Sequence, residues 1–210
     1  MIGPPCQSAP VEFAEVLRRR RMVRSYDPAR PVPPQVLRRV VAAALRGPSA
    51  GFSQGSDLVV LSTPHDVETF WTASTPDPAP GGPWLAGLRT APALVLCLAD
   101  PARYRARYAE QDKAASDQDW AVPWWDVDTG MAALLVLLAA VDEGLGACLF
   151  GVPSVRHDAV RTAFGVPAGH RVVGAVTLGT PAPDRPSPSL RRGRRPAGEV
   201  LHGGRFGRPL

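Results

Sequence analysis

The chain has 210 residues, of which 45% are hydrophobic and 20% charged, a composition typical of a soluble globular protein with one domain. Its formal net charge of +5 comes almost wholly from arginine, so the total charge is weak support for nucleic-acid binding. The apolar run of residues 132–141 is too short to span a bilayer, and we expect neither a membrane nor a nucleic-acid partner.

Residues 1–10 are predicted to form a disordered leader that lacks the pattern of a signal peptide. The three cysteines, Cys6, Cys97 and Cys148, are an odd number without the spacing of a metal site. Two of them lie in apolar, strand-like runs. A reduced, cytoplasmic protein is therefore predicted.

From Val11, apolar residues recur at helical spacing and the predicted helix runs into an arginine cluster, with five arginines between Arg18 and Arg24. Guanidinium groups are costly to bury without an anionic partner. Because Val23 and Tyr26 indicate a folded segment, the cluster favours a fixed phosphate site. A solvated basic helix end is the alternative.

Residues 35–46 are predicted to form an amphipathic helix that ends at Gly47 and Pro48. The loop of residues 49–54 follows, and its small residues allow backbone amides to approach a planar ligand closely. Ser49, Ser53 and Gln54 offer hydrogen-bonding side chains for the edge of that ligand. A plain helix-to-strand turn is the alternative.

Strands are predicted at residues 57–62 and 91–98, and residues 104–119 are predicted to form a polar helix or lid. Three tryptophans then occur within residues 120–125. Each of them fits a core or a subunit interface as well as an aromatic wall over a bound ring. Asp126 or Asp128 is expected to cap the helix that follows.

Residues 129–143 are apolar on nearly every face, so this helix must be covered by the sheet of its own domain or by a partner chain. Strands are predicted at residues 147–151 and 172–179, with an amphipathic helix between them. The remaining segment is rich in proline and then in arginine. No second domain or internal repeat is found.

Classical catalytic patterns are absent from the sequence. The four histidines show no metal spacing, no serine occupies a nucleophile elbow, and no phosphate-binding glycine loop follows a strand. We therefore expect no catalytic side chain and no metal. If the chain is an enzyme, a bound cofactor carries the chemistry.

The order of several motifs carries a resemblance. An arginine pair, the turn of residues 24–28, a Pro-Val-Pro helix start and the Pro-Ser-Ala-Gly-Phe-Ser-Gln loop of residues 48–54 resemble the amino-terminal half of FMN-dependent nitroreductase-like flavoproteins. Phe52, where many members have Asn, is more similar to the subgroup that contains the flavin-fragmenting enzyme of dimethylbenzimidazole synthesis. After Gln54, Gly55 and Ser56 replace the usual Pro-Trp.

The resemblance implies an α+β, nitroreductase-like fold with a central, mostly antiparallel sheet flanked by helices. Residues 11–184 would form the flavin-binding domain. Residues 185–210 would be an extended C-terminal arm that completes the domain and packs on the partner subunit. The long apolar helix would lie at the interface of a homodimer.

The resemblance also implies the cofactor contacts. Arg20 and Arg21 match a basic pair near the phosphate, Met22 stands where Ser is usual, and Arg24 matches a basic residue near the pyrimidine edge of the ring. In total, the resemblance implies that the cofactor is contacted by Arg20, Arg21, Met22, Arg24, Ser49, Ala50, Gly51, Phe52, Gln54, Leu149, Phe150, Gly151, Arg192 and Arg194. Trp124 and Trp125 are candidates for the substrate pocket.

The implied activity is a ping-pong reaction in which NAD(P)H delivers hydride to FMN and a nitroaromatic, quinone or enone then takes the electrons. NADH and NADPH both remain open, and so does a deazaflavin in place of FMN. A non-catalytic flavin-binding or sequestering protein and an oxygen-dependent, flavin-consuming enzyme are alternatives. So is a nucleic-acid binder that uses the arginine-rich ends and the tryptophans.

Overall fold

The computed structural model describes residues 12–75, 82–113, 119–184 and 187–210, so the predicted leader lies outside the described residues. The α-helices of the described chain are α1 (Phe13–Arg19), α2 (Pro34–Ala42), α3 (Pro64–Ser74), α4 (Gly82–Leu88), α5 (Pro101–Tyr108), α6 (Trp124–Asp142) and α7 (His157–Ala163). The strands are β1 (Ser56–Leu61), β2 (Ala93–Ala99), β3 (Gly146–Phe150) and β4 (Arg171–Gly179). Short 3-10 helices include η1 (Ala43–Arg46), η2 (Ala50–Phe52), η3 (Gln111–Lys113), η4 (Ser154–Arg156), η5 (Pro188–Arg192) and η6 (Ala197–Glu199).

The four strands form one sheet in the order β1-β2-β4-β3, and every neighbouring pair is antiparallel. All seven residues of β2 are buried, as expected for a strand covered on both faces. Leu94, Leu96 and Leu98 enter one core cluster, whereas Val95 and Cys97 enter the other, because successive side chains of a strand point to opposite faces. The predicted α+β architecture is confirmed.

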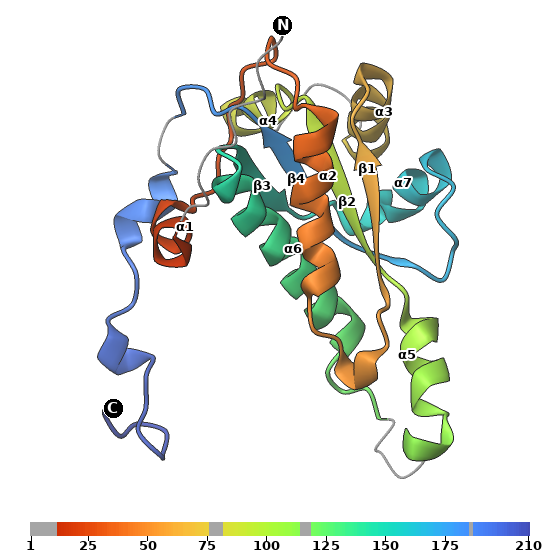
Figure 1. Ribbon diagram of the computed structural model, residues 1–210, viewed down its shortest axis with the longest axis vertical. Coiled ribbons are helices and arrows are strands. Elements are labelled where there is room, and N and C mark those ends of the chain that lie inside the picture. The colour runs from red at the N-terminus through yellow and green to blue at the C-terminus, as the bar shows by residue number, and fades with distance from the viewer. Residues whose placement is uncertain (1–11, 76–81, 114–118, 185–186) are drawn as a thin grey trace, which may run out of the picture.

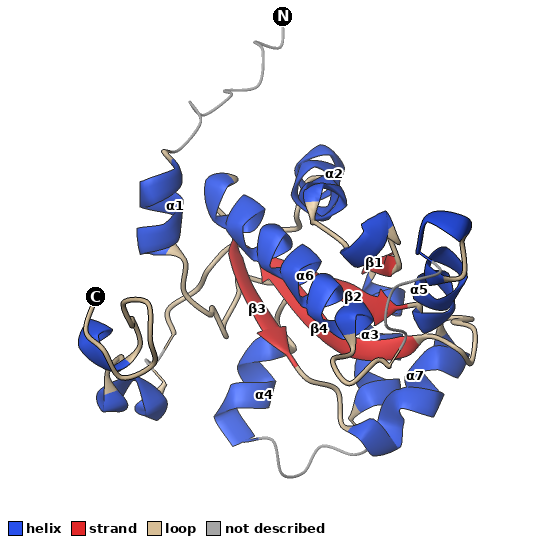
Figure 2. Cartoon of the chain, turned by 90° about the horizontal axis from the view of Figure 1, so that it is seen from below, coloured by secondary structure: helices blue, strands red, loops and turns tan. Residues whose placement is uncertain are grey.

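The two core clusters lie on opposite faces of the sheet (Figure 2). One is completed by α3, α4 and α7, for example through Phe70, Leu88 and Val160. The other is completed by α2 and α6, for example through Val40 and Val136. Helix α3 starts where the sequence dictates, since Thr63 and Asp66 form a reciprocal capping box.

Helix α6 begins at Trp124, five residues before the predicted start at residue 129. The expectation that Asp126 or Asp128 caps it is wrong, because Pro123 occupies the N-cap position. Among the described helices α6 alone is long and apolar enough to cross a membrane, a test that core helices also pass. It contacts all four strands, which is how a core helix behaves.

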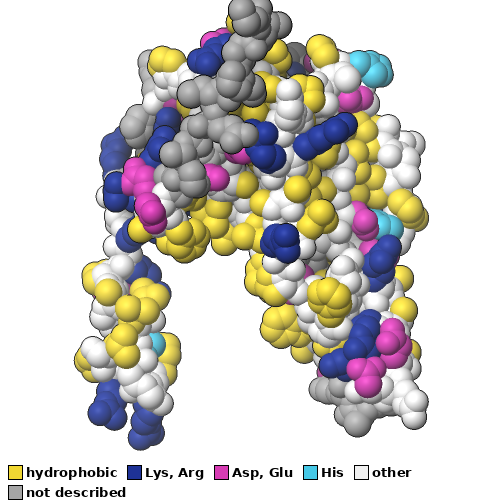
Figure 3. All heavy atoms as spheres, viewed as in Figure 1, with side chains coloured by type: hydrophobic (Ala, Val, Ile, Leu, Met, Phe, Trp, Pro, Cys, Tyr) yellow, Lys and Arg dark blue, Asp and Glu magenta, His cyan; other side chains and the backbone are white. Residues whose placement is uncertain are grey.

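The two ends of the domain meet beside β3 and β4. The Asp27 N–H donates to the Thr180 carbonyl at 3.0 Å, and the Ala182 N–H donates to the Ser25 carbonyl at 3.0 Å. Beyond this pairing the predicted C-terminal arm leaves the domain (Figure 1). The hydrogen bonds described for residues 187–210 all stay within the arm. Figure 3 shows an open space between the arm and the rest of the molecule.

The fold places the segment after α1 against α4 with almost no clearance. A Cβ atom added to Gly87 would lie 2.1 Å from the carbonyl oxygen of Arg24. We therefore expect Gly87→Ala to lower the free energy of unfolding by about 1–3 kcal/mol, because the backbone must shift. Gly169→Ala is the matched control, since no atom lies within 4 Å of its added Cβ, and it should change stability by less than about 0.5 kcal/mol. Urea denaturation of both variants measures the difference, and equal effects would contradict this account of the packing.

Candidate functional site

The arginine cluster continues from α1 into an extended segment, residues 20–26, that lies beside β3. These residues form the arginine segment. Met22 forms a parallel bridge with Ala147, and the Val23 N–H donates to the Ala147 carbonyl at 3.0 Å. Val23 is buried in the core. Because side chains alternate along an extended chain, Arg20, Met22 and Arg24 lie on the side opposite Val23, and all three are only partly buried.

The arginines of this cluster differ in their partners. Arg18 and Arg19 pair with Glu15 on α1, and the Arg21 guanidinium lies 3.9 Å from the Asp184 carboxylate. Within the described residues, no carboxylate pairs with the Arg20 guanidinium. The charge of Arg20 is thus available to an anion, whereas the charges of Arg18, Arg19 and Arg21 are partly neutralised by these carboxylates.

Three side-chain contacts, two of them buried, fix the backbone of this segment. The Tyr26 hydroxyl donates to the Val23 carbonyl at 2.6 Å and lies 2.8 Å from the Thr177 hydroxyl oxygen. Burial raises the pKa of Tyr26 well above its ordinary value, so the hydroxyl stays a donor. The Arg24 N–H donates to the Asp184 carboxylate at 2.9 Å. The segment is therefore a fixed part of the fold and not a loose basic tail.

A cavity of about 260 Å³ opens at the C-terminal end of α6. Arg19, Arg21 and Val23 line it on one side, and residues 144–146 line it on the other. Arg21 thus faces this cavity on the side of Val23, away from Arg20 and Arg24.

The loop of residues 49–54 has an unusual backbone. Gly51 has a φ of 59°, Phe52 of 57° and Gln54 of 50°, all in the left-handed region. Glycine adopts this region freely, but each non-glycine residue pays about 1–2 kcal/mol. Such strain persists only where surrounding contacts impose it, and it clusters at functional sites. The Phe52 side chain is 74% exposed.

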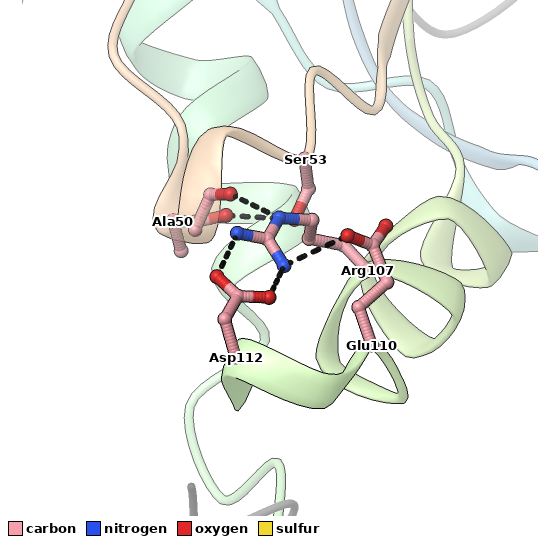
Figure 4. A network of polar contacts seen from close by, with 6 residues as sticks. Ala50, Ser53, Arg107, Glu110 and Asp112 are labelled. Atoms are coloured by element: carbon pink, nitrogen blue, oxygen red, sulfur yellow. Dashed lines mark hydrogen bonds and ion pairs between the residues drawn. The ribbon is translucent and has the colours of Figure 1, made fainter. Parts of the chain in front are cut away.

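Contacts within the loop, from α6 and from α5 impose this conformation. Within the loop, the Ser53 hydroxyl donates to the Ala50 carbonyl at 2.7 Å, and the Gln54 N–H donates to the Ser49 hydroxyl at 3.0 Å. From α6, the Asp128 carboxylate accepts the Ala50 N–H at 2.8 Å. From α5, the Arg107 Nε donates to the Gly51 carbonyl at 2.9 Å (Figure 4).

The arginine segment and the loop lie at opposite ends of α6. The loop is bonded to Asp128 in the second turn, whereas residues 144–146 beside the arginine segment follow the last turn. A helix of 19 residues is about 28 Å long, so the two groups are about 20 Å apart along its axis. Figure 1 shows this separation, with η2 near α5 and the segment after α1 at the far end of α6. One chain does not bring the two predicted groups together.

Predicted site residues on β3 lie on different sides of the sheet. Leu149 packs against the core cluster of α2 and α6. Phe150 stacks on Trp71 with ring centroids 5.6 Å apart, and Trp84 approaches its edge. Gly151 follows the strand and is exposed. Only the end of β3 is open to a ligand.

The two candidate tryptophans for the substrate pocket differ in exposure. Trp124 is 44% exposed at the start of α6, but Trp125 is 8% exposed. Trp125 packs among Tyr104 and Trp120, with the Arg105 guanidinium over its ring. Trp125 is therefore a core residue, one of the roles that the sequence left open for it.

Arg192 and Arg194 lie on the C-terminal arm and are exposed. Arg195 pairs with Glu199 within the arm, and within the described residues neither Arg192 nor Arg194 has a carboxylate partner. Among the described residues, no hydrogen bond or ion pair joins either arginine to the arginine segment of its own chain.

Sequence reasoning missed the side chains that hold the loop. Asp128 was expected to be a helix cap, and neither Tyr104 nor Arg107 was singled out. The available signal was Asp128 itself, a carboxylate inside a strongly apolar helix, since such a group requires buried hydrogen-bond donors. A second cavity, of about 630 Å³ between α2 and β1, was also not predicted. Apolar side chains, with Arg38 and Asp57, line it.

The family model for the nitroreductase family matches residues 17–180, which include the arginine segment, the strained loop and all four strands. The chain belongs to the nitroreductase family. The resemblance inferred from the motifs is confirmed. No curated protein matches the sequence.

Solved structures of nitroreductases share the fold. An FMN-dependent nitroreductase from Clostridium difficile R20291 is 20% identical with a TM-score of 0.66, covering 91% of this chain and 98% of that one. A nitroreductase family protein from Clostridium difficile 630 is 20% identical with a TM-score of 0.70, covering 93% and 100%. NfrA1 of B. megaterium is 19% identical with a TM-score of 0.72, covering 92% and 74%. At these identities the likeness concerns the fold.

Proposed function

We propose that this nitroreductase family member is an FMN-dependent oxidoreductase that takes hydride from NAD(P)H and reduces a small, electron-poor acceptor by a ping-pong mechanism. Nitroaromatics, quinones and enones are the acceptor classes. Family membership supports the enzyme class. One structural neighbour is named an FMN-dependent nitroreductase, and another, from Staphylococcus epidermidis, is provisionally named an NAD(P)H:FMN oxidoreductase. We further propose that the protein works in the cytoplasm.

The observation that carries the proposal is the fixed, extended arginine segment. Arg20 and Arg24 lie on one side of it, half-buried, and within the described residues Arg20 has no carboxylate partner. A phosphate is the anion that such guanidinium groups bind best. Arg192 and Arg194 of the arm, equally without carboxylate partners in the described chain, would complete its charge balance.

The chain's residues suit the other parts of FMN as well. The side chains of Ser49 and Gln54 can bind the polar edge of the ring system. The N–H groups of residues 50 and 52–54 instead donate to acceptors within the protein. Arg24 would stabilise negative charge on the reduced ring. When bound, FMN supplies the redox chemistry, accepting hydride from the nicotinamide and passing electrons to the acceptor. The protein would bind, orient and shield the reactants, and no side chain is assigned as acid or base.

We propose a homodimer because part of α6 remains uncovered. Trp124, Val127 and Leu134 are exposed, and Met131 and Leu138 are half-buried. Their spacing places them on one stripe of the helix, with the periodicity of a helix-pairing seam. An apolar stripe of this length is typical of a surface covered by a partner.

A two-fold axis across this stripe would also bring the two halves of the site together. Two antiparallel copies of α6 place the N-terminal end of one beside the C-terminal end of the other. The strained loop of one subunit would then face the arginine segment of its partner. The dimer would supply the proximity that a single chain lacks.

The C-terminal arm is proposed to pack on the partner subunit. Its exposed apolar side chains, which its own domain does not cover, are Leu190, Val200, Leu201, Phe206 and Leu210. Such side chains need an apolar surface, and Figure 3 shows that the arm stands clear of its own domain.

The first test is the colour of the purified protein. We expect an absorbance spectrum of oxidised flavin that NADPH or NADH bleaches under anaerobic conditions and that a quinone restores. Denaturation should release FMN, identified by mass spectrometry. Colour that neither nicotinamide bleaches would support a non-catalytic flavin binder instead. A colourless protein that takes up no added FMN would contradict the proposal.

The second test concerns the phosphate. Arg20→Ala and Arg194→Ala should each raise the dissociation constant of FMN by about tenfold or more, because each removes a charge-assisted hydrogen bond. Arg18→Ala and Arg195→Ala are the matched controls, since these neighbours pair with Glu15 and Glu199. Fluorescence titration of FMN measures the four constants. Unchanged binding in both test variants would count against this phosphate site.

The third test concerns the dimer. Leu134→Glu places a charge in the proposed interface and should convert the dimer to monomer while lowering flavin occupancy. Val155→Glu, at a residue that is 87% exposed on η4, should leave the dimer intact. Light scattering coupled to gel filtration measures the mass. A monomeric wild-type protein that binds FMN would contradict the two-subunit site.

A further inference from the structure

We propose that Asp128 and Arg107 are positioning residues that clamp the loop of residues 49–54 in its strained conformation and so set flavin affinity. The inference rests on the proposed function, because the loop is the part of the chain assigned to the ring edge. Neither residue belongs to the contacts implied by the family motifs.

Asp128 is the inner clamp. Its side chain is 2% exposed, and its Oδ2 accepts both the Ala50 N–H at 2.8 Å and the Tyr104 hydroxyl at 2.8 Å. A carboxylate inside an apolar helix is costly unless donors satisfy it. Burial and the Asp128 carboxylate raise the pKa of Tyr104, which keeps that hydroxyl a donor. The carboxylate is thus committed to fixing the start of the loop.

Arg107 is the outer clamp. Its Nε donates to the Gly51 carbonyl, while its two terminal nitrogens donate to both carboxylate oxygens of Asp112 at 2.8 and 2.7 Å. A further bond of 3.1 Å reaches Glu110. Figure 4 shows the guanidinium between the loop and these acidic side chains. Because the planar fork is oriented by two carboxylates, the Nε–H is aimed at the loop and cannot turn away without breaking them.

The loop is also confined by an aromatic ring. A Cβ atom added to Gly51 would lie 2.8 Å from the Tyr108 ring. Tyr108 belongs to α5, as does Arg107, whereas Asp128 belongs to α6. Two helices therefore hold the loop, α6 at the Ala50 amide and α5 at the Gly51 carbonyl.

These contacts oppose the strain at Phe52 and Gln54. Without them, the backbone of both residues would relax toward the ordinary regions, and the loop would lose its fixed shape. The Phe52 side chain, which contacts solvent over most of its surface, would change direction with them. A preorganised loop binds its ligand more tightly, since the ordering cost is met before binding.

The test compares two substitutions with two matched controls. Asp128→Asn keeps the size of the side chain but replaces one acceptor oxygen by a donor group, and Arg107→Lys keeps the charge but loses the planar fork. The controls are Asp126→Asn, two residues earlier on α6, and Arg103→Lys, four residues earlier on α5. Asp126 pairs with Arg171 and Arg103 with Asp100, and neither ion pair includes a residue of the loop.

Two quantities are measured for each protein. In flavin-free protein, hydrogen exchange of a peptide spanning residues 49–54 should accelerate about tenfold or more in the two test variants. In the presence of FMN, the dissociation constant should rise about tenfold or more, and the visible circular dichroism of bound FMN should change. Both controls should stay within about twofold of wild type, and all variants should retain the wild-type urea m-value.

The outcomes separate the clamp from the proposed function. Accelerated exchange with unchanged FMN affinity and spectrum would overturn the positioning role, as would unchanged exchange in both test variants. If wild type binds no FMN, the proposed function fails, and the exchange rates still decide whether the clamp exists. If Asp128→Asn does not fold, Arg107→Lys decides, since the Arg107 contacts lie at the surface.

Discussion

The structure is organised by the need to cover α6, a helix of 19 residues that is apolar on nearly every face. The sheet and α2 cover one side of it, and α1 covers part of another. The stripe that includes Val127 and Leu134 remains open. Because burying this stripe requires a second apolar surface, the same helix that anchors the core also accounts for the proposed dimer.

The position of α6 also explains how a site can be split between two chains. Its N-terminal part holds the strained loop through Asp128, and its C-terminal end adjoins the arginine segment. A rigid helix keeps these groups apart within one subunit. It would also keep them at a constant spacing across a two-fold axis. A small ligand between the subunits would then meet cations from one and the polar side chains of the loop from the other.

The two groups are held by different physical means. The arginine segment is fixed by backbone pairing with β3 and residues 180–182, by the Asp184 carboxylate and by the buried Tyr26 hydroxyl. The loop is fixed by charged side chains, which offset backbone strain at Phe52 and Gln54. Unlike both, the arm makes its described hydrogen bonds only within itself, and its arginines would be fixed by the partner surface on which we propose that it packs.

The sequence by itself determined the order of the strands and of the described helices except α4, which it missed, because hydrophobic periodicity and the placement of proline and glycine act over a few residues. It also identified the family, since the arginine segment and the loop are each continuous in the chain. The start of α6 was predicted too late because Asp126 and Asp128 interrupt the apolar pattern. The pattern alone does not reveal that Asp128 is a buried residue inside the helix. Only the tertiary structure decided that Asp128 binds an amide 78 residues away, that Trp125 is a core residue, and that the two parts of the site lie at opposite ends of one helix. Each of these depends on packing between segments distant in sequence, which local patterns do not encode.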